Sequence, residues 1–388
     1  MITTKPTSAS EKIATLAEQY GSPLLLLDCD IIRKRYTNLA AALPNTDLFY
    51  AIKSQPHPTV LETLAELGCG FDIATSGEIS LLRDIELSPR NTIHTHPIKK
   101  ESEILDALRY GCTTFVVDNI YEIEKFIPFR NRVRLLIRIS FPNPGCPVDL
   151  SSKFGCPPEQ AMLLINRAEK LGINIKGLSF HAGSQCGNPD NHVYAINRCN
   201  EIIQQALTES GKLLSVLDIG GGFPADYSEQ IDISRFCQPI NEALQQLPDH
   251  IQVIAEPGRY ISAAAMTSIS RIVGKARRND KTWYYIDDGV YGSFSGMIYD
   301  HAQYPLTVYS DIPELEEAVI AGPTCDSIDV IAKDILLPPL NIGDLIIGEQ
   351  MGAYTSASAT DFNLAKRAEF IVINRGDIAE KEHQTISA

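Results

Sequence analysis

Short apolar runs alternate with longer amphipathic stretches through the first two thirds of the chain. The apolar runs span residues 48–52, 70–74, 92–95, 114–117, 133–139, 175–181, 216–219 and 253–256. Stretches with helical spacing lie at residues 30–43, 56–68, 76–86, 99–110, 120–128, 157–172, 190–210 and 229–247. Parallel strands need crossover connections and are buried on both faces, so eight strands alternating with helices predict a parallel (β/α)8 barrel.

The pattern changes after about residue 262. The pieces at residues 266–273, 282–287, 317–321, 345–348 and 369–373 are typical of strands. Ahead of the barrel, residues 10–20 are typical of a helix and residues 22–28 of a buried strand. We therefore expect two domains: a barrel over residues 29–262, and a mostly β domain formed by residues 1–28 and 263–388.

Composition narrows the functions that such a fold would serve. The chain has 388 residues, 48 of them acidic and 34 basic, and a net charge of -14. This charge disfavours nucleic acid and anionic membranes as partners. The sequence lacks the apolar segment of a signal peptide and any run long enough to span a bilayer, and its nine cysteines show no paired spacing for disulfides or zinc. We expect a soluble cytoplasmic protein without a bound metal.

Lys53 ends the first predicted barrel strand, in the run Asp47-Leu-Phe-Tyr-Ala-Ile-Lys53. Catalytic groups of parallel barrels lie where the strands end, at the carboxyl face. An amine held there between an apolar wall and solvent should lose its proton more readily than a surface lysine, and it could then attack a carbonyl. A solvated lysine at a strand end is the alternative.

Other polar residues fall at the same edge of the barrel. They are Asp72 with Glu78 after strand two, Arg138 at strand five, His181 at strand six and Glu256 at strand eight. A histidine in this position would stack on a ring or, alternatively, be a core residue bonded to the backbone. Their shared place at strand ends predicts one site.

Three consecutive glycines at residues 220–222 follow strand seven. Residues without Cβ let backbone N–H groups gather around an anion, and this loop of a barrel is a common phosphate site. Arg259, after strand eight, could add a charge-assisted contact. A tight turn and a surface arginine are the alternative. A phosphate opposite an amine suggests pyridoxal phosphate, with Glu256 facing its pyridine nitrogen.

The chain resembles the fold-type III pyridoxal-phosphate decarboxylases, and among them the ornithine decarboxylases. The resemblance covers residues 20–365 through collinear motifs: Phe49-Tyr-Ala-Ile-Lys53, Phe71-Asp-Ile-Ala-Thr-Ser-Gly-Glu78, His181-Ala-Gly-Ser184, Gly220-Gly-Gly-Phe-Pro224, Glu256-Pro-Gly-Arg-Tyr260, Tyr291-Gly-Ser-Phe-Ser-Gly-Met-Ile-Tyr-Asp-His301, Gly322-Pro-Thr-Cys-Asp326 and Gly352-Ala-Tyr-Thr355. It implies an alanine-racemase-like barrel with a second, mostly β domain.

The resemblance also implies roles for individual residues. Lys53 would bind the cofactor covalently, with His181 stacked on its ring and Glu256 at its pyridine nitrogen. The phosphate would be held by Ser184, Gly221, Gly222, Arg259 and Tyr354, and the pocket would also be lined by Asp72, Glu78 and Arg138. Tyr299 and Asp300 would bind substrate, while Cys325 and Asp326 would come from the partner subunit.

The implied reaction is the decarboxylation of L-ornithine to putrescine by an obligate homodimer with two shared active sites. Cys325 would protonate Cα, and Asp300 with Asp326 would pair with the distal ammonium of the substrate. Taken alone, Cys325 is more simply an inert residue. Its place in the motif Gly322-Pro-Thr-Cys-Asp326 makes it a candidate catalytic residue.

Several alternatives stay open. The sequence departs from the family pattern at His96, Gln55 and Ala182, which leaves L-lysine or 2,4-diaminobutyrate as possible substrates. Diaminopimelate decarboxylase shares the barrel and the lysine but needs a cationic pocket for a second carboxylate. An amino-acid racemase and a non-catalytic relative are the remaining rivals.

Overall fold

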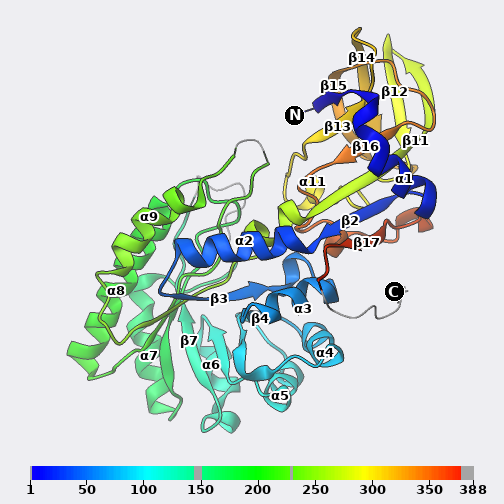
Figure 1. Cartoon of the computed structure of the whole chain (residues 1–388). Helices are drawn as coiled ribbons and strands as arrows, with labels where there is room; N and C mark the ends of the chain where they lie inside the picture. Colours follow the sequence, from blue (N-terminus) through cyan, green and yellow to red (C-terminus); the bar gives the residue numbers. More distant parts are fainter. Residues whose placement is uncertain (1, 144–150, 228–229, 377–388) are drawn as a thin grey trace.

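The computed structural model describes residues 2–143, 151–227 and 230–376. Figure 1 shows a barrel ringed by helices and, beside it, a part built mostly of strands. Eight parallel strands close the barrel in the order β10-β3-β4-β5-β6-β7-β8-β9. The predicted barrel and the predicted mostly β part are both confirmed.

Each barrel strand is short and each is followed by a helical segment, as the alternation in the sequence predicts. The strands are β3 (Thr46–Ala51), β4 (Gly70–Ile73), β5 (Thr92–His94), β6 (Thr114–Val117), β7 (Arg134–Arg138), β8 (Ile175–Ser179), β9 (Val216–Asp218) and β10 (Gln252–Ala255). The surrounding helices are α2 (Cys29–Ala42), α3 (Pro58–Glu66), α4 (Ser76–Asp84), α5 (Glu101–Tyr110), α6 (Ile120–Lys125), α7 (Ala161–Lys170), α8 (Asp190–Ser210) and α9 (Ile233–Leu244), and a short α10 (Arg259–Ser262) follows β10.

Polar caps fix where the loops after the strands become helices. Thr75 accepts a hydrogen bond from the Glu78 N–H at 3.3 Å before α4, and Asn119 accepts one from the Glu122 N–H at 3.0 Å before α6. Each cap satisfies a donor that the first helical turn leaves unpaired. The caps therefore help to hold the loops on which the strand-end residues lie.

Two apolar layers support the barrel. The larger lies between the strands and the helices, where one face of each helix is buried. A separate small cluster joins buried residues from five strands with Phe49 of β3, namely Ile93, Val116, Leu136, Val216 and Ile254. Its members come from strands around the whole barrel and do not belong to the outer layer, so we place the cluster in the barrel interior.

The second sheet draws its strands from both ends of the chain. They are β1 (Ile2–Lys5), β2 (Leu24–Asp28), β11 (Met266–Arg278), β12 (Lys281–Ile286), β13 (Leu306–Tyr309), β14 (Glu316–Ala321), β15 (Val330–Leu337), β16 (Leu345–Gly348) and β17 (Glu369–Ile373), with helices α1 (Glu11–Tyr20) and α11 (Gly296–Tyr299) beside them. The strand order is β1-β13-β16-β11-β12-β14-β15, and β2 pairs with both β11 and β17. The sequence pattern did not predict β1, β13 or β15.

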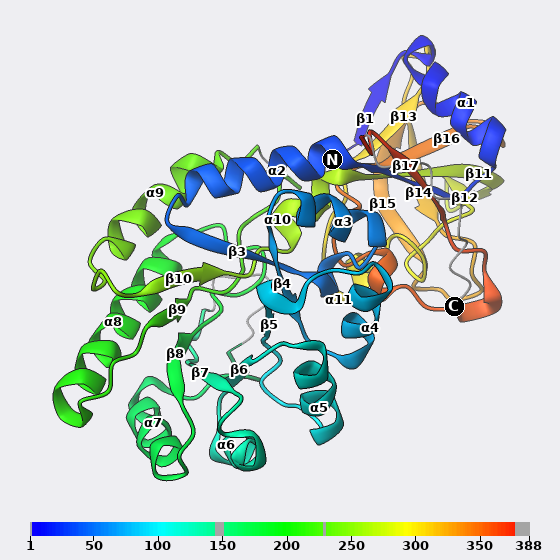
Figure 2. The same ribbon diagram turned by 60° about the horizontal axis from the view of Figure 1, so that its bottom comes forward.

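The division into residues 29–262 and residues 1–28 with 263–388 is our proposal. In its favour, β2 pairs only within the second sheet and runs directly into α2 of the barrel. Figure 2 shows this continuity from a second direction. Residue 1 and residues 377–388, which are assigned to the second domain, lie outside the described residues, and so does residue 229, where a helix was expected to begin.

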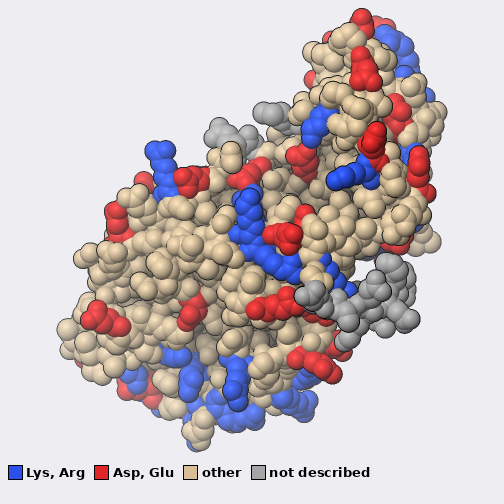
Figure 3. Space-filling view, in the orientation of Figure 1, with Lys and Arg blue, Asp and Glu red and all other residues tan. Residues whose placement is uncertain are grey.

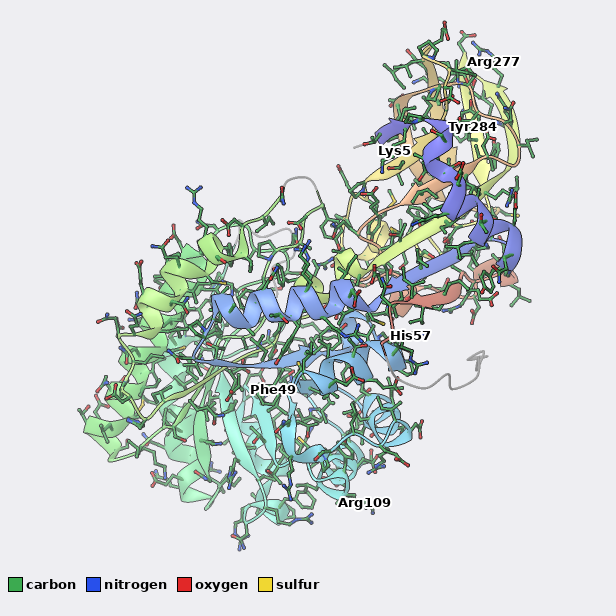
Figure 4. The ribbon with its side chains drawn as sticks, in the orientation of Figure 1. Lys5, Phe49, His57, Arg109, Arg277 and Tyr284 are labelled. Carbon is green, nitrogen blue, oxygen red and sulfur yellow. The ribbon has the colours of Figure 1, made fainter. Side chains whose placement is uncertain are left out.

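The two parts pack against each other through α3 and β17. The ring of His57, labelled in Figure 4, lies 4.7 Å from the ring of Phe370 between centroids. His57 also accepts a hydrogen bond from the Thr59 N–H at 3.2 Å and so caps α3. Burial lowers the pKa of His57 to about 4, so the ring at this junction is neutral near pH 7.

Charges of both signs cover the face drawn in Figure 3, with basic side chains gathered along the lower edge of the barrel. The acidic excess of the chain therefore does not form a single acidic face in this view. Of the cysteines, eight lie in the described ranges, all as free thiols, and Cys325 alone among these eight is exposed. Within the described residues, no helix combines the length and apolar character that crossing a membrane requires.

Gly177 tests the closure of the barrel, because β8 and β9 approach each other closely at this residue. A Cβ at Gly177 would lie 1.9 Å from the Val216 carbonyl oxygen. We expect Gly177→Ala to force the strands apart and to lower the free energy of unfolding by about 1 to 3 kcal/mol. Urea unfolding measures the change, and Gly187→Ala is the control because no heavy atom lies within 4 Å of its added Cβ. Equal midpoints for the two variants would contradict close approach at Gly177.

Candidate active site

The carboxyl ends of the barrel strands bring the predicted polar residues to one rim. Lys53 lies just beyond β3, in a short 3-10 helix at Ile52–Ser54, rather than on the strand itself. Asp72 lies within β4 and Arg138 is the last residue of β7. His181 and Glu256 follow β8 and β10. Residues far apart in the sequence therefore meet at one end of the barrel.

A cavity of about 270 Å³ opens at this rim. Ten of the predicted site residues line it: Lys53, Arg138, His181, Ser184, Gly221, Gly222, Glu256, Arg259, Asp300 and Tyr354. Most come from the barrel, whereas Asp300 and Tyr354 come from the second part of the chain. The wall is completed by residues of both polar and apolar character.

Lys53 forms an ion pair with Asp72, with 2.7 Å between Nζ and Oδ2. The Asp72 side chain is fully buried, whereas that of Lys53 is 42% exposed because it faces the cavity. Burial lowers the pKa of the Lys53 amine, but the negative charge of Asp72 beside it raises it, and the net change is upward. The expectation of an easily deprotonated amine is therefore wrong for Lys53 beside this buried carboxylate.

Asp72 is itself held by two neighbours. The hydroxyl of Thr95, in the loop after β5, donates a hydrogen bond to Oδ1 of Asp72, while Oδ2 faces Lys53. Glu78 does not line the cavity and instead accepts from the Ala74 N–H. Burial raises the pKa of Glu78 to about 7, so this carboxyl group is partly protonated near neutral pH.

His181 presents a neutral imidazole. Its Nδ1 accepts a hydrogen bond from the Gly183 N–H at 3.1 Å, so the proton lies on Nε2. Burial, together with the positive charges of Arg138 and Lys53, holds the pKa of His181 well below its usual value. A neutral ring fixed by its own backbone is suited to lie flat against another ring.

Glu256 lies beside a second buried carboxyl group, Asp218, the last residue of β9. Burial raises the pKa of Glu256 well above its usual value, and the charge of Asp218 raises it further. Asp218 also accepts hydrogen bonds from the Gly220 N–H at 2.8 Å and from the Ser179 hydroxyl at 3.1 Å. With Asp218 held by these donors, Glu256 is the member that retains a proton.

Arg259 also lines the cavity. Its guanidinium donates to the Ser184 hydroxyl and the Tyr227 hydroxyl, both at 3.0 Å, and forms an ion pair with Asp300. The guanidinium carbon also lies 4.8 Å from the ring centre of Tyr354. Within the described residues, Nε of Arg259 is buried without a hydrogen-bond partner. A buried cation with spare donors favours an anion.

The glycine loop beside Arg259 leaves no room for side chains. A Cβ at Gly221 would lie 2.7 Å from the Glu256 carbonyl oxygen and 3.0 Å from Nε2 of His181, and a Cβ at Gly222 would lie 2.5 Å from the Gly183 carbonyl oxygen. Gly222 also has a φ of +102°, which side chains rarely allow. The loop therefore keeps the space beside His181 and Arg259 open.

These groups fit pyridoxal phosphate. The amine of Lys53 suits an aldehyde, the neutral ring of His181 suits a flat heterocycle, and Glu256 suits a ring nitrogen. At the other end, Arg259, Ser184 and the glycine N–H groups suit a phosphate. Asp300 accepts a hydrogen bond from the Arg259 guanidinium, so a phosphate would compete with Asp300 for this donor.

Five predicted residues do not line the cavity: Asp72 and Glu78, described above, and Tyr299, Cys325 and Asp326. Tyr299 is 58% exposed, Cys325 is exposed and its N–H donates to Asn363 Oδ1 at 3.0 Å, and Asp326 accepts a hydrogen bond from the Tyr291 hydroxyl. Within one chain, the structure does not bring Asp326 and Asp300 into hydrogen-bond or ion-pair contact with each other among the described residues. The roles predicted for Cys325 and Asp326, but not that of Tyr299, depend on a second chain.

Sequence reasoning missed other residues of the site. Thr95 follows β5 at the same rim, so the strand-end rule was a signal for it, whereas His96 beside it was noted as a departure from the family pattern but not as a site residue. Asp218 stands directly before the glycine loop, where a buried strand end was also a signal. Phe154 and Gln185 line the cavity from loops, and nothing in the sequence pattern marked them.

Known proteins share both the sequence and the fold. The family model for the pyridoxal-dependent decarboxylase, pyridoxal binding domain, matches residues 29–263. A crystal structure of lysine/ornithine decarboxylase complexed with putrescine from Vibrio vulnificus is 52% identical, with a TM-score of 0.91 over 96% of this chain and 100% of that one. The lysine/ornithine decarboxylase of Selenomonas ruminantium is 34% identical over 92% of this chain and 90% of its own.

One further relative is not named as a decarboxylase. Antizyme inhibitor 2 of Xenopus laevis is 35% identical over 86% of this chain and 77% of its own. The family model, which matches more than half of the chain, and the relatives agree with the cavity and its donor set. The chain belongs to the pyridoxal-phosphate-dependent decarboxylases of the ornithine/arginine decarboxylase family, with a fold-type III barrel.

Proposed function

We propose that this protein decarboxylates L-ornithine to putrescine, and that L-lysine is its second substrate. The observation that carries the proposal is one cavity with the Lys53 amine at one side and the Arg259 and glycine cradle at the other. The Vibrio relative was solved with putrescine and also with cadaverine. Two diamines in one relative favour a pocket that accepts two chain lengths, because one methylene changes binding by only about 1 to 3 kcal/mol.

The residues divide the work of holding the cofactor. Lys53 would hold its aldehyde carbon, His181 its ring face and Glu256 its pyridine nitrogen, while Ser184, Gly221, Gly222, Arg259 and Tyr354 would hold the phosphate. When bound, pyridoxal phosphate supplies an electron sink for the negative charge that develops at Cα as carbon dioxide leaves. Glu256 supports this role because its raised pKa lets it offer a proton at the ring nitrogen.

Asp300 is proposed to change partners when the site fills. In the structure it is paired with Arg259 and has little exposure. A phosphate carries more negative charge than one carboxylate and meets the Arg259 donors together with Ser184 and the glycine N–H groups. The phosphate would therefore displace Asp300, which would then be free to meet the distal ammonium of the substrate with Tyr299 beside it.

We also propose a homodimer that completes each site. Exposed apolar residues lie near Cys325 in the sequence or next to Asn363, which accepts its N–H: they are Ile328, Phe362 and Leu364, the last 88% exposed. Phe362 stacks on Tyr291 at 4.4 Å between ring centres, and Tyr291 in turn bonds Asp326. Exposed apolar surface of this kind favours a protein partner. A second copy would carry Cys325 to the Cα and Asp326 to the distal ammonium.

Two rivals are less well supported. A diaminopimelate decarboxylase needs a cation for the second carboxylate at the distal end of the substrate, whereas Arg259, the cation paired with Asp300, is the group proposed to hold the phosphate. A non-catalytic relative is supported by the similarity to antizyme inhibitor 2. Lys53, Cys325 and the glycine loop are all present here, however, and each has a place in the reaction.

The substrate is tested first by carbon dioxide release. Purified protein with added pyridoxal phosphate should release carbon dioxide from L-ornithine and, more slowly, from L-lysine, because the pocket binds one distal ammonium. Release from meso-diaminopimelate or L-2,4-diaminobutyrate at equal concentration should be lower. A preference for diaminopimelate would mean that the pocket assignment is wrong, and release from none would favour a non-catalytic relative.

Lys53→Ala should abolish turnover and the visible absorbance of bound pyridoxal phosphate, because the covalent attachment is lost. Steady-state assays and absorbance spectra measure both effects. Lys12→Ala, an exposed lysine on α1, serves as the control and should change neither. An active Lys53→Ala variant would disprove the role of this amine.

Shared sites can be tested by mixing two inactive variants. Lys53→Ala and Cys325→Ala subunits should each have little activity alone, and a mixed dimer should regain one complete site. At equal amounts with random exchange, half of the dimers are mixed, so about one quarter of wild-type activity should return. Mass spectrometry verifies the exchange, and no recovery after verified exchange counts against a site built from two chains.

A further inference from the structure

Lys99 is a fully buried lysine that the predicted reaction does not use. It lies in the loop between β5 and α5, two residues before the helix, and its side chain is 0% exposed. Burying a lysine is costly unless its donors are satisfied. Its place behind the cavity wall therefore calls for a physical reason.

The ammonium of Lys99 joins three backbone carbonyls. Nζ donates to the carbonyl oxygens of His96 at 2.7 Å, Pro97 at 3.0 Å and Val116 at 2.7 Å. The first two belong to the loop after β5 and the third to the end of β6. These three contacts use all three donors of the ammonium, so Lys99 ties the loop to the neighbouring strand.

Glu122 of α6 anchors the same loop from behind. Its Oε2 accepts from the Lys99 N–H at 3.2 Å and lies 3.9 Å from Nζ, while Oε1 pairs with Lys125. Lys125 also donates to the Lys99 carbonyl oxygen at 2.8 Å. Burial lowers the pKa of Lys99 to about 7, and the charge of Glu122 opposes this change.

The tethered loop forms one wall of the active-site cavity. Thr95, His96 and Pro97 all line it. The Thr95 N–H still donates to the Ile73 carbonyl at 3.1 Å, so the backbone pairing between β4 and β5 ends at Thr95. Beyond Thr95, the carbonyls of His96 and Pro97 depend on Lys99 for their donor.

The wall reaches the reactive amine through Thr95. Its hydroxyl donates to Asp72, and Asp72 holds Nζ of Lys53 at 2.7 Å. We propose that Lys99 is a positioning residue, which acts through the loop at residues 95–98 to hold Thr95 against Asp72 and thereby sets the placement of Lys53. The inference deepens the proposed function and rests on it for the role of Lys53.

Lys99→Met keeps the length of the side chain and removes the three donors. We expect kcat to fall about 10- to 100-fold, because small displacements of reacting groups have effects of this size. The pH midpoint of the visible absorbance change of protein loaded with pyridoxal phosphate should move to lower pH. Asp72 stabilises the protonated nitrogen of Lys53, and a displaced carboxylate stabilises it less.

Thr95 supplies the matched comparison. Thr95→Val should move the absorbance midpoint in the same direction, whereas Thr95→Ser keeps the hydroxyl and should leave it near the wild-type value. If Lys99 acts through Thr95, the double variant Lys99→Met with Thr95→Val should shift the midpoint no more than the larger single change. Additive shifts would overturn the proposed route.

Ile104→Ala controls for lost stability. Ile104 is buried on α5, the helix that follows the same loop, and its loss removes packing without removing a donor to the loop. Ile104→Ala should lower the urea midpoint but preserve the absorbance midpoint. A Lys99→Met variant that behaves like Ile104→Ala would make Lys99 purely structural. The absorbance titration needs no substrate, so a failure of the ornithine and lysine assays would leave its result interpretable.

Discussion

Closure of the eight parallel strands is the constraint on which the site depends. A parallel barrel presents the carboxyl ends of all its strands at one rim, so residues as far apart in the sequence as Lys53 and Glu256 meet there. The interior cluster, which includes Phe49 and Ile254, fills the barrel. The polar groups therefore face a limited volume rather than a channel.

Charge balance then decides what this cavity can bind. Lys53 is paired with Asp72 and Arg259 with Asp300, while Arg138 packs over Phe154 and has no ion pair with a carboxylate among the described residues. Glu256 and Asp218 hold less than two negative charges because burial raises the pKa of both, and the charge of Asp218 raises that of Glu256 further. A chain with a net charge of -14 thus keeps a cavity that favours an anion.

The sequence predicted the barrel because its strands and helices differ in period and length. It failed where strands are polar or lie outside the alternation of strands and helices: β1 is mostly exposed, β15 carries Lys333 and Asp334 at its centre, and the four-residue β13 is not part of the regular repeat that located equally short barrel strands. Lys53, His181 and Glu256 were located because they lie at predicted strand ends. The rule that catalytic groups lie at the carboxyl ends of barrel strands depends on topology alone. The pair between Arg259 and Asp300 was not predictable, because it joins two parts of the chain that the pattern does not relate. Lys99 falls in a stretch typical of a helix start, where a lysine is normally solvated, and its burial depends on packing by α6.

The second part of the chain takes part in the cavity through backbone contacts. The Tyr354 N–H donates to the Ser54 carbonyl oxygen at 2.9 Å, one residue after Lys53, and the Tyr354 ring lies against Arg259. Tyr354 has a φ of 54°, a conformation that tyrosine rarely adopts and that persists only where its surroundings impose it. The same bond therefore joins the two parts of the molecule and sets the spacing between the amine and the anion end. A cofactor that spans both ends must match this spacing, so the contact between the two parts is itself a determinant of cofactor binding.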